Sequence, residues 1–143
     1  MSGLDRFVEA QRGVYDQALA ELRAGHKTSH WMWFVFPQIA GLGQSPTARH
    51  FAIRDLDEAR DYLAHPLLAA RLERSVQAVT GWAGRRSAEA MLGGIDAMKL
   101  RSSCTLFEAA GVGAAGGGPV FAACLDALFD GARDAATLRL IGR

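Results

Sequence analysis

Residues 26–38 read HKTSHWMWFVFPQ, and the fold class depends on whether the aromatic half of this stretch is a helix or a strand. A short run of aromatic and β-branched residues is typical of a buried strand. No other segment alternates apolar and polar residues, however, so a strand here has nothing to pair with. Ser29 can cap a helix start and Pro37 can end the helix. We interpret residues 31–36 as a short buried helix, with a buried strand as the alternative.

The remaining apolar residues recur at helical spacing. In residues 4–22 the large apolar side chains follow a three–four pattern, which predicts one amphipathic helix that ends before Gly25. Further helix starts are marked by capping side chains or by proline, at Ser45–Pro46, Asp55 with Glu58, Pro66, Ser87, Asp96, Pro119 and Asp134. The pattern predicts an all-α fold, a single compact multihelical domain of about seven to eight helices over residues 1–143. Residues 111–118, GVGAAGGG, are predicted to form an internal loop.

The amino-acid composition is that of an ordinary globular protein and argues against several kinds of partner. Half of the residues are apolar, 22% are charged and the net charge is +1, with acids and bases interspersed. A nucleic-acid partner is therefore not indicated. The chain shows no signal-peptide pattern, and its longest apolar run is too short to span a membrane, so we expect a cytoplasmic protein without a membrane partner. Cys104 and Cys124 lack CxxC spacing and are predicted to be reduced and buried. The four histidines lack ligand spacing, so no metal or cofactor is predicted.

The polar residues that precede the aromatic run form the first candidate site. Lys27, Ser29 and His30 stand where hydroxyl and backbone N–H groups at a helix start can bind an anion. The alternative is a solvated helix cap. Trp31 and Trp33 either fill the core or stack on a planar ligand. Core packing explains most of the aromatic run but does not require the polar residues in front of it.

The second candidate site is DAMKLRSSCTLF, residues 96–107. On a helix, Lys99 lies beside the apolar stripe of Leu100, Cys104 and Phe107, and Ser102 and Ser103 are its i+3 and i+4 neighbours. A desolvated Lys99 could act as a base, or a Ser–Lys pair could act as a nucleophile. The alternative is a lysine that extends its ammonium to water.

Gln38 and the turn that follows it could line the mouth of a pocket. Gly41 and Gly43 lie in this turn, and glycine allows the backbone to approach a ligand closely.

Several stretches resemble one bacterial family. SHWMWFVFPQ, EARDYLAHPLLAARL, KLRSSCTLFEAA and DAATLRLIG are similar to the domain of unknown function 1810 family, and the Ala- and Gly-rich composition is similar to its actinobacterial members. Some members are labelled calpastatin, but nothing here resembles a calpain-inhibitory repeat. The resemblance implies a compact multihelical fold and no established activity. It also implies that the two polar clusters face each other across one pocket. Cys104 departs from the family's usual methionine.

These observations lead to two hypotheses. In the first, the chain binds a small anionic ligand, nucleotide-like or ADP-ribose-like. Lys27, Ser29, Trp31, Trp33, Gln38 and Ser102 contact it, and Lys99, Ser103 and His30 supply any catalysis. In the second, the same residues serve core packing in a non-enzymatic assembly module that forms a homodimer. Whether the protein is an enzyme is left open by the sequence.

Overall fold

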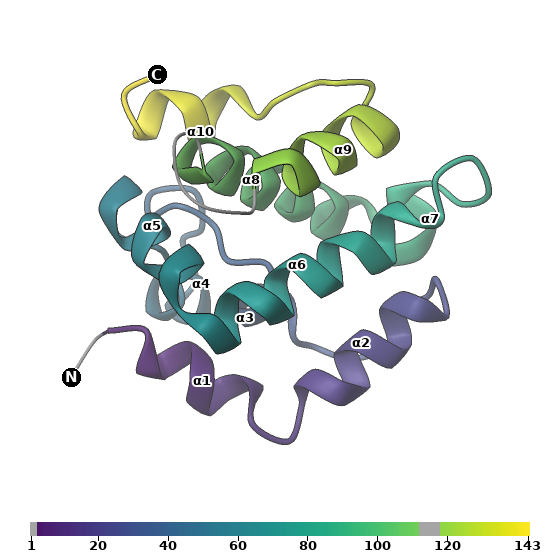
Figure 1. The fold of residues 1–143 in the computed structure, drawn as a ribbon, viewed down its shortest axis with the longest axis horizontal. Coiled ribbons are helices and arrows are strands. Elements are labelled where there is room, and N and C mark those ends of the chain that lie inside the picture. The colour runs from purple at the N-terminus through teal and green to yellow at the C-terminus, as the bar shows by residue number, and fades with distance from the viewer. Residues whose placement is uncertain (1–2, 112–117) are drawn as a thin grey trace.

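The computed structural model describes residues 3–111 and 118–143, and over these residues the fold is all-α, as predicted (Figure 1). The helices are α1 (Asp5–Gln11), α2 (Tyr15–Arg23), α3 (Met32–Val35), α4 (Pro46–His50), α5 (Leu56–Ala64), α6 (Pro66–Thr80), α7 (Ala88–Leu92), α8 (Gly94–Gly111), α9 (Gly118–Phe129) and α10 (Ala135–Leu140). The described residues hold no strand, only an isolated bridge between Ile39 and Ile53. These ten helices of the described residues exceed the predicted seven to eight, in part because the single helix predicted over residues 4–22 is two, α1 and α2.

The aromatic run is helical, and most of it is core. Helix α3 covers Met32–Val35, and the side chains of Trp31, Met32, Val35 and Phe36 are buried. The predicted cap is wrong: the N-cap position is Trp31, and no side chain caps the helix there. The hydroxyl of Ser29 bonds elsewhere.

The helix predicted over residues 4–22 is two helices. The chain turns between α1 and α2 at Gly13, whose φ of 74° lies in the left-handed region that favours glycine. The break lets α1 pack on α3 while α2 packs on α6. The apolar spacing continued across the turn, so periodicity alone could not locate it.

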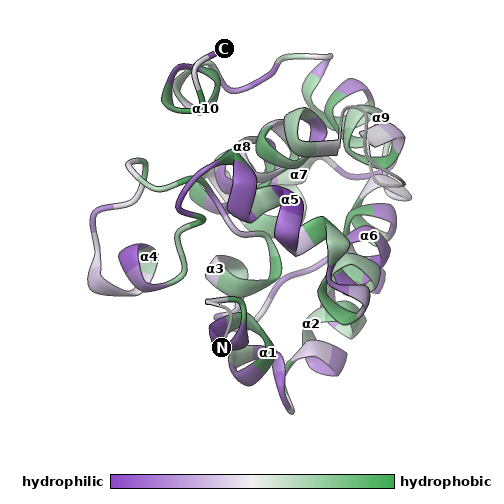
Figure 2. Cartoon of the chain, turned by 60° about the vertical axis from the view of Figure 1, so that its left-hand side comes forward, coloured by the Kyte–Doolittle hydropathy of each residue, from purple (hydrophilic) through white to green (hydrophobic). Residues whose placement is uncertain are grey.

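Helix α8 is the central element. It packs against α5, α7, α9 and α10, and every side chain from residue 102 to residue 107 is buried. Figure 1 shows α1 and α2 on one side of the molecule and α9 and α10 on the opposite side, with α8 between them. The predicted stripe of Leu100, Cys104 and Phe107 is confirmed as core. In Figure 2 the outer helices show hydrophilic residues outward, whereas α4 stands apart from the bundle on an extended loop.

Apart from Ser29, four predicted caps are confirmed and one is wrong. The side chains of Ser45, Asp55, Ser87 and Asp134 each accept a hydrogen bond from a backbone N–H in the first turn of the helix that follows. Asp96 lies inside α8, two residues after its start at Gly94, and its carboxylate is engaged in ion pairs instead. Residues 112–117 of the predicted loop lie outside the described residues, whereas Gly111 ends α8 and Gly118 begins α9.

Among residues 3–111 and 118–143, none of the helices combines the length and the apolar character that crossing a lipid bilayer requires.

Candidate functional site

A buried carboxylate organises the polar residues in front of α3. Glu21 of α2 accepts five hydrogen bonds, from the backbone N–H groups of Thr28 and Ser29, the Ser29 hydroxyl at 2.6 Å, the Trp31 indole at 3.0 Å and the Gln17 amide. Burial alone would raise the pKa of Glu21, but these hydrogen bonds outweigh it and hold the pKa well below its ordinary value. The donors predicted to bind an external anion at this place therefore already bind an internal one.

The two lysines of the chain meet at one carboxylate. Of sixteen Lys and Arg residues only Lys27 and Lys99 are lysines, and both pair with Asp96. Lys27 Nζ lies 3.0 Å from Asp96 Oδ2, and Lys99 Nζ lies 3.6 Å from Asp96 Oδ1. Each ammonium also faces a tryptophan ring, Lys27 at 5.2 Å from the centroid of Trp31 and Lys99 at 4.9 Å from that of Trp33. The cluster has one more positive than negative charge, with its side chains largely removed from water.

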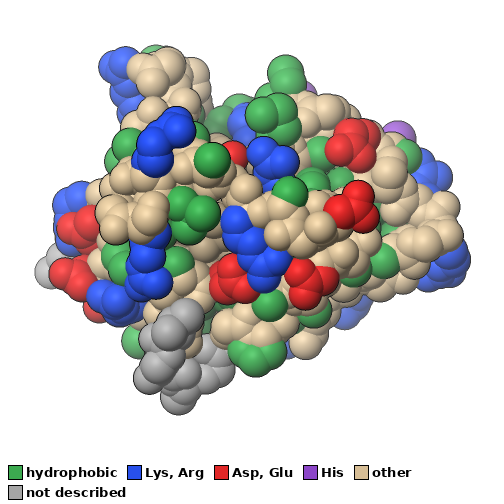
Figure 3. Space-filling view, turned by 90° about the horizontal axis from the view of Figure 1, so that it is seen from above, with side chains coloured by type: hydrophobic (Ala, Val, Ile, Leu, Met, Phe, Trp, Pro, Cys, Tyr) green, Lys and Arg blue, Asp and Glu red, His purple; other side chains and the backbone are tan. Residues whose placement is uncertain are grey.

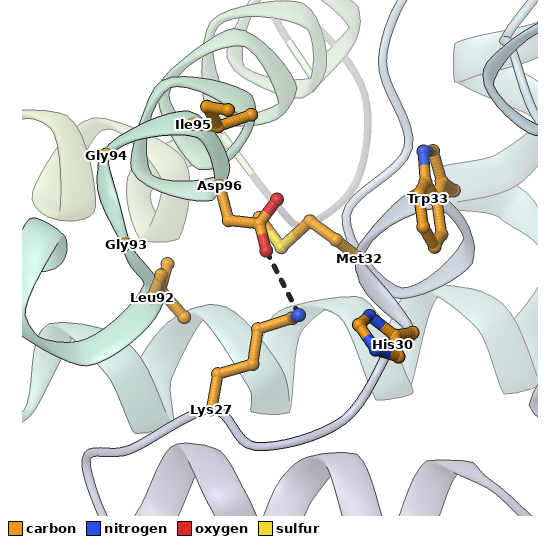
Figure 4. A pocket seen from close by; sticks show the side chains of 9 residues that line it. All are labelled: Lys27, His30, Met32, Trp33, Leu92, Gly93, Gly94, Ile95 and Asp96. Atoms are coloured by element: carbon orange, nitrogen blue, oxygen red, sulfur yellow. Dashed lines mark ion pairs between the residues drawn. The ribbon is translucent and has the colours of Figure 1, made fainter. Parts of the chain in front are cut away.

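A pocket of about 370 Å³, which we call the Asp96 pocket, opens beside this cluster (Figure 4). Its lining residues are Lys27, His30, Met32, Trp33, Leu92, Gly93, Gly94, Ile95 and Asp96. Figure 4 shows residues 93–96 along one side and His30 and Trp33 on the other, with the Lys27 ammonium directed at Asp96. The pocket thus brings together Lys27, His30 and Trp33, three of the predicted site residues.

The start of α8 forms part of the wall of the Asp96 pocket. Gly93 precedes this 18-residue helix and has no side chain that could cap it. The first N–H groups of a helix lack intrahelical partners, and the helix dipole places positive potential there. The start of α8 therefore places the positive end of a helix dipole at the wall of the Asp96 pocket.

A second hollow of about 310 Å³, the Gln38 groove, lies further along α8. It is lined by Gln38, Leu42, Gly43, Ile95, Met98, Lys99, Ser102, Asp134 and Ala136. Gln38, Lys99 and Ser102 are predicted site residues, and the groove brings them together. Ile95 lines both hollows, so the two are neighbours on the surface of α8.

Three predicted site residues lie in neither hollow. Trp31 is fully buried, and Ser29 bonds to Glu21. Ser103 is also buried, with 1% of the residue exposed, and its hydroxyl has no hydrogen-bond partner among the described residues. The roles predicted for these residues stay predictions, and none of the three lines the Asp96 pocket or the Gln38 groove.

The sequence reasoning missed the carboxylates that position the site. Glu21 had no local signal, because a glutamate of an amphipathic helix is ordinarily exposed, whereas this one is buried. Asp96 was interpreted as a cap, although the spacing of Asp96 and Lys99 at i,i+3 is that of a helical ion pair. Asp134 was predicted only as a cap, and it also lines the Gln38 groove.

Neither the cysteines nor the histidines form a second centre in the described part of the chain. Cys104 and Cys124 are free and buried, as predicted. A hydrogen bond with Cys124, together with burial, raises the pKa of the Cys104 thiol, which makes it inert. No group of three His, Cys, Asp or Glu side chains within the described residues is arranged to hold a metal ion.

The fold and the site together define a class: a small all-α domain in which both lysines of the chain converge on one carboxylate beside a tryptophan-lined pocket. Residues 1–141 match the model of the family described as "Protein of unknown function (DUF1810)", and the chain belongs to that family. The family resemblance seen in the sequence is thereby confirmed. No curated protein matches the chain.

The chain is also similar to a solved structure, that of the conserved hypothetical protein Rv1873 from Mycobacterium tuberculosis. The two share 44% sequence identity with a TM-score of 0.91, over 98% of this chain and 96% of that chain. At this identity the similarity extends beyond the fold to much of the sequence.

Proposed function

We propose that this protein binds a small molecule that carries an anionic group, and that the Asp96 pocket is the binding site. One observation carries the proposal: both lysines of a chain that otherwise uses arginine lie at this pocket, paired with Asp96. An ammonium is a compact cation with three donors, so Lys27 can bond an incoming anion while it stays near Asp96. The first N–H groups of α8 add positive potential on the same wall.

The ligand class follows from the rest of the lining. Trp33 is half-buried and offers an aromatic surface, and Met32 supplies a polarisable apolar floor. His30 is exposed at the rim, where it can donate to or accept from a bound group. An anion beside an aromatic wall suits a nucleotide-like or ADP-ribose-like molecule. We propose no nucleic-acid partner, because on the face seen in Figure 3 basic and acidic side chains stand side by side.

Catalysis at this site would depend on His30 and Lys99, the two predicted catalytic groups that border the hollows. Ser103 lines neither hollow, so the binding proposal does not use it. Ser103→Ala tests its predicted role: full binding together with loss of turnover would assign it to catalysis. A cytoplasmic location is part of the same proposal.

A thermal-shift panel tests the binding proposal. Nucleotides, ADP-ribose, NAD, sugar phosphates and small carboxylates are compared on the wild type, Lys27→Met and Lys99→Ala. A ligand at 100 times its Kd stabilises the folded state by about 2.7 kcal/mol. We expect one class to shift the wild type and to lose most of that shift in Lys27→Met.

Arg74→Met is the matched control for this panel. Arg74 is an exposed cation of α6 that forms no hydrogen bond or ion pair within the described residues, so the Arg74→Met substitution should leave the ligand shift unchanged. A panel without any shift in the wild type would refute the proposal.

The alternative function is a non-enzymatic assembly module, and one observation favours it. Ser29 and Trp31 bond to Glu21 inside the protein, so at least these two residues serve packing. Ile95 and Met98 are exposed apolar side chains on one turn of α8, where a second copy could pack. Sedimentation equilibrium of the wild type and Ile95→Glu tests this alternative. A dimer that dissociates in Ile95→Glu, with no ligand shift, would support it.

A further inference from the structure

One face of α8 borders the Gln38 groove. Ile95, Met98, Lys99 and Ser102 follow the i, i+3, i+4, i+7 spacing of a single helix face, and all four line the groove. The opposite walls come from the chain at Gln38 and Leu42 and from the start of α10. Ile95 and Met98 are 75% and 62% exposed, which is unusual for large apolar residues of this protein.

The polar groups of the groove retain unused hydrogen-bonding capacity. The half-buried Gln38 side-chain amide has no hydrogen-bond partner among the described residues. Within the described part of the chain, Lys99 has the 3.6 Å ion pair with Asp96 and its contact with Trp33 and no further polar contact. Ser102 donates to the Met98 carbonyl, and its hydroxyl also lies beside Asp134, where it helps to lower the pKa of that carboxylate; the lone pairs of the Ser102 oxygen are what it can offer a ligand. Donors and acceptors are therefore both available.

Asp134 supplies the negative charge of the groove. Its Oδ2 accepts from the backbone N–H and the hydroxyl of Thr137, whereas the only ion pair of its Oδ1 is a long one, 3.4 Å from Arg101. Burial alone would raise the pKa of Asp134, but the Thr137 and Arg101 hydrogen bonds outweigh it and lower the pKa, so the group is ionised at neutral pH. Asp134 Oδ1 can therefore accept a shorter hydrogen bond from a ligand than the one it accepts from Arg101.

This charge pattern selects the kind of group that fits. Asp134 repels a carboxylate or a phosphate, and Lys99 repels an ammonium. The complementary group is neutral and can donate and accept at the same atom, which describes a hydroxyl. The apolar side chains of Leu42, Ile95 and Met98 suit the C–H face of a ring that carries such hydroxyls.

We propose that the Gln38 groove is a second subsite, which binds the sugar-like, hydroxyl-bearing ring of the ligand whose anionic group occupies the Asp96 pocket. The inference rests on the proposed function and deepens it. Ile95 lines both hollows, and the Asp96–Lys99 ion pair joins the two lining sets. The ligand class is accordingly a phosphorylated sugar, free or as part of a nucleotide.

The experiment is a ¹H–¹⁵N NMR titration with inorganic phosphate, ribose and ribose 5-phosphate. The side-chain NH₂ of Gln38 reports on the groove, and the indole N–H of Trp33 reports on the Asp96 pocket. The Trp31 indole is the internal reference, because it is buried and bonded to Glu21. We expect phosphate to shift Trp33 alone, and ribose 5-phosphate to shift Trp33 and Gln38 and to bind about tenfold more tightly.

Two variants complete the test, with Gln44→Leu as the control in the neighbouring exposed loop. We expect Gln38→Leu, and separately Ser102→Ala, to weaken the binding of ribose 5-phosphate until its affinity equals that of inorganic phosphate. If both probes bind equally and the Gln38 NH₂ does not move while Trp33 does, the sugar subsite is refuted and the proposed function stands. If only Gln38 responds, the subsite stands and the anion site is refuted. If neither reporter responds to any probe, both are refuted.

Discussion

At the scale of single residues, Glu21 shows how one buried carboxylate can replace an external ligand. Thr28, Ser29 and Trp31 all donate to it, although the sequence pattern of these residues resembled an anion site. A pattern of donors predicts that an anion will be bound. It does not tell whether the anion comes from solution or from the same chain. Here the chain supplies it, and the loop that carries Lys27 and His30 is held in place as a result.

We expect Glu21→Gln to lower the free energy of unfolding by about 2–3 kcal/mol, because hydrogen bonds to a charged acceptor are lost and the new amide N–H groups face donors. Urea denaturation measures the change. Glu73→Gln on α6 is the control, since Glu73 is exposed and should change stability by less than about 0.5 kcal/mol. Equal effects of the two substitutions would contradict the role assigned to Glu21.

The same carboxylate makes stability depend on pH. The pKa of Glu21 in the folded protein lies well below the ordinary value of 4.5, because hydrogen bonds from Ser29, Thr28 and others outweigh the effect of burial. The unfolded chain therefore takes up a proton near pH 4.5 while the folded chain does not. The stabilisation is complete above about pH 4.5 and is lost as the pH falls below it.

Acid unfolding measures this dependence. Two other carboxylates behave in the same way: burial is outweighed at Glu58 by a hydrogen bond from Arg6 and at Asp134 by hydrogen bonds from Thr137, so the pKa of each is lowered. Their contributions to the stability of the protein are therefore also lost as the pH falls. We expect Glu21→Gln to weaken the pH dependence below pH 4.5 without abolishing it. A wild type and a variant with parallel curves would show that Glu21 is not ionised more readily in the folded state.

At the scale of elements, local chemistry located most helices. Ser45, Asp55, Ser87 and Asp134 cap helices because a side-chain oxygen needs only the N–H groups of the next turn. The cap predictions that were wrong concern side chains that could form either of two hydrogen bonds or ion pairs of similar energy. Ser29 could cap α3 or bond to Glu21, and the second is made because α2 lies beside the loop.

Glycine substitutions at helix ends should differ in a fixed order. Gly13→Ala should cost about 1 kcal/mol, since its φ is 74° and a new Cβ meets nothing within 4 Å. Gly25→Ala should cost more, because the left-handed φ is combined with a Cβ position 2.7 Å from the Trp82 ring. Gly94→Ala, in α8 with open space, should be neutral or stabilising. Thermal unfolding of the three variants gives the order, and an equal loss in all three would contradict it.

At the scale of the whole molecule, α8 joins the core to both hollows. Its inner side chains belong to the core, its first turn lines the Asp96 pocket, and residues from Ile95 to Ser102 line the Gln38 groove. The tilt of the site walls is therefore set by how α8 packs against α5, α7 and α9.

Phe107 tests this dependence. Its ring lies 5.2 Å from that of Tyr62 in α5 and 5.8 Å from that of Phe121 in α9. We expect Phe107→Ala to lower the free energy of unfolding by about 3–5 kcal/mol and to unfold much of the protein at 37 °C. The control is Leu67→Ala, because Leu67 is 40% exposed and loses little buried surface. Circular dichroism during thermal unfolding measures both, and a small loss in Phe107→Ala would show that α8 is not central to stability.

The helical class, most helix ends and the buried cysteines were readable in the sequence, since periodicity and capping act over a few neighbouring residues. Lys27, Lys99 and Gln38 could also be named as candidates, and each of them lines a hollow. The sequence did not reveal four other features: the turn at Gly13, the hydrogen bonds to Glu21, the ion pairs of both lysines with Asp96 and the burial of Ser103. Each of these depends on how separate helices and loops pack together, which the few neighbouring residues that set periodicity and capping do not decide. The polar residues were thus recognisable as candidates, but only packing determined which of them face a hollow and which are bound inside the protein.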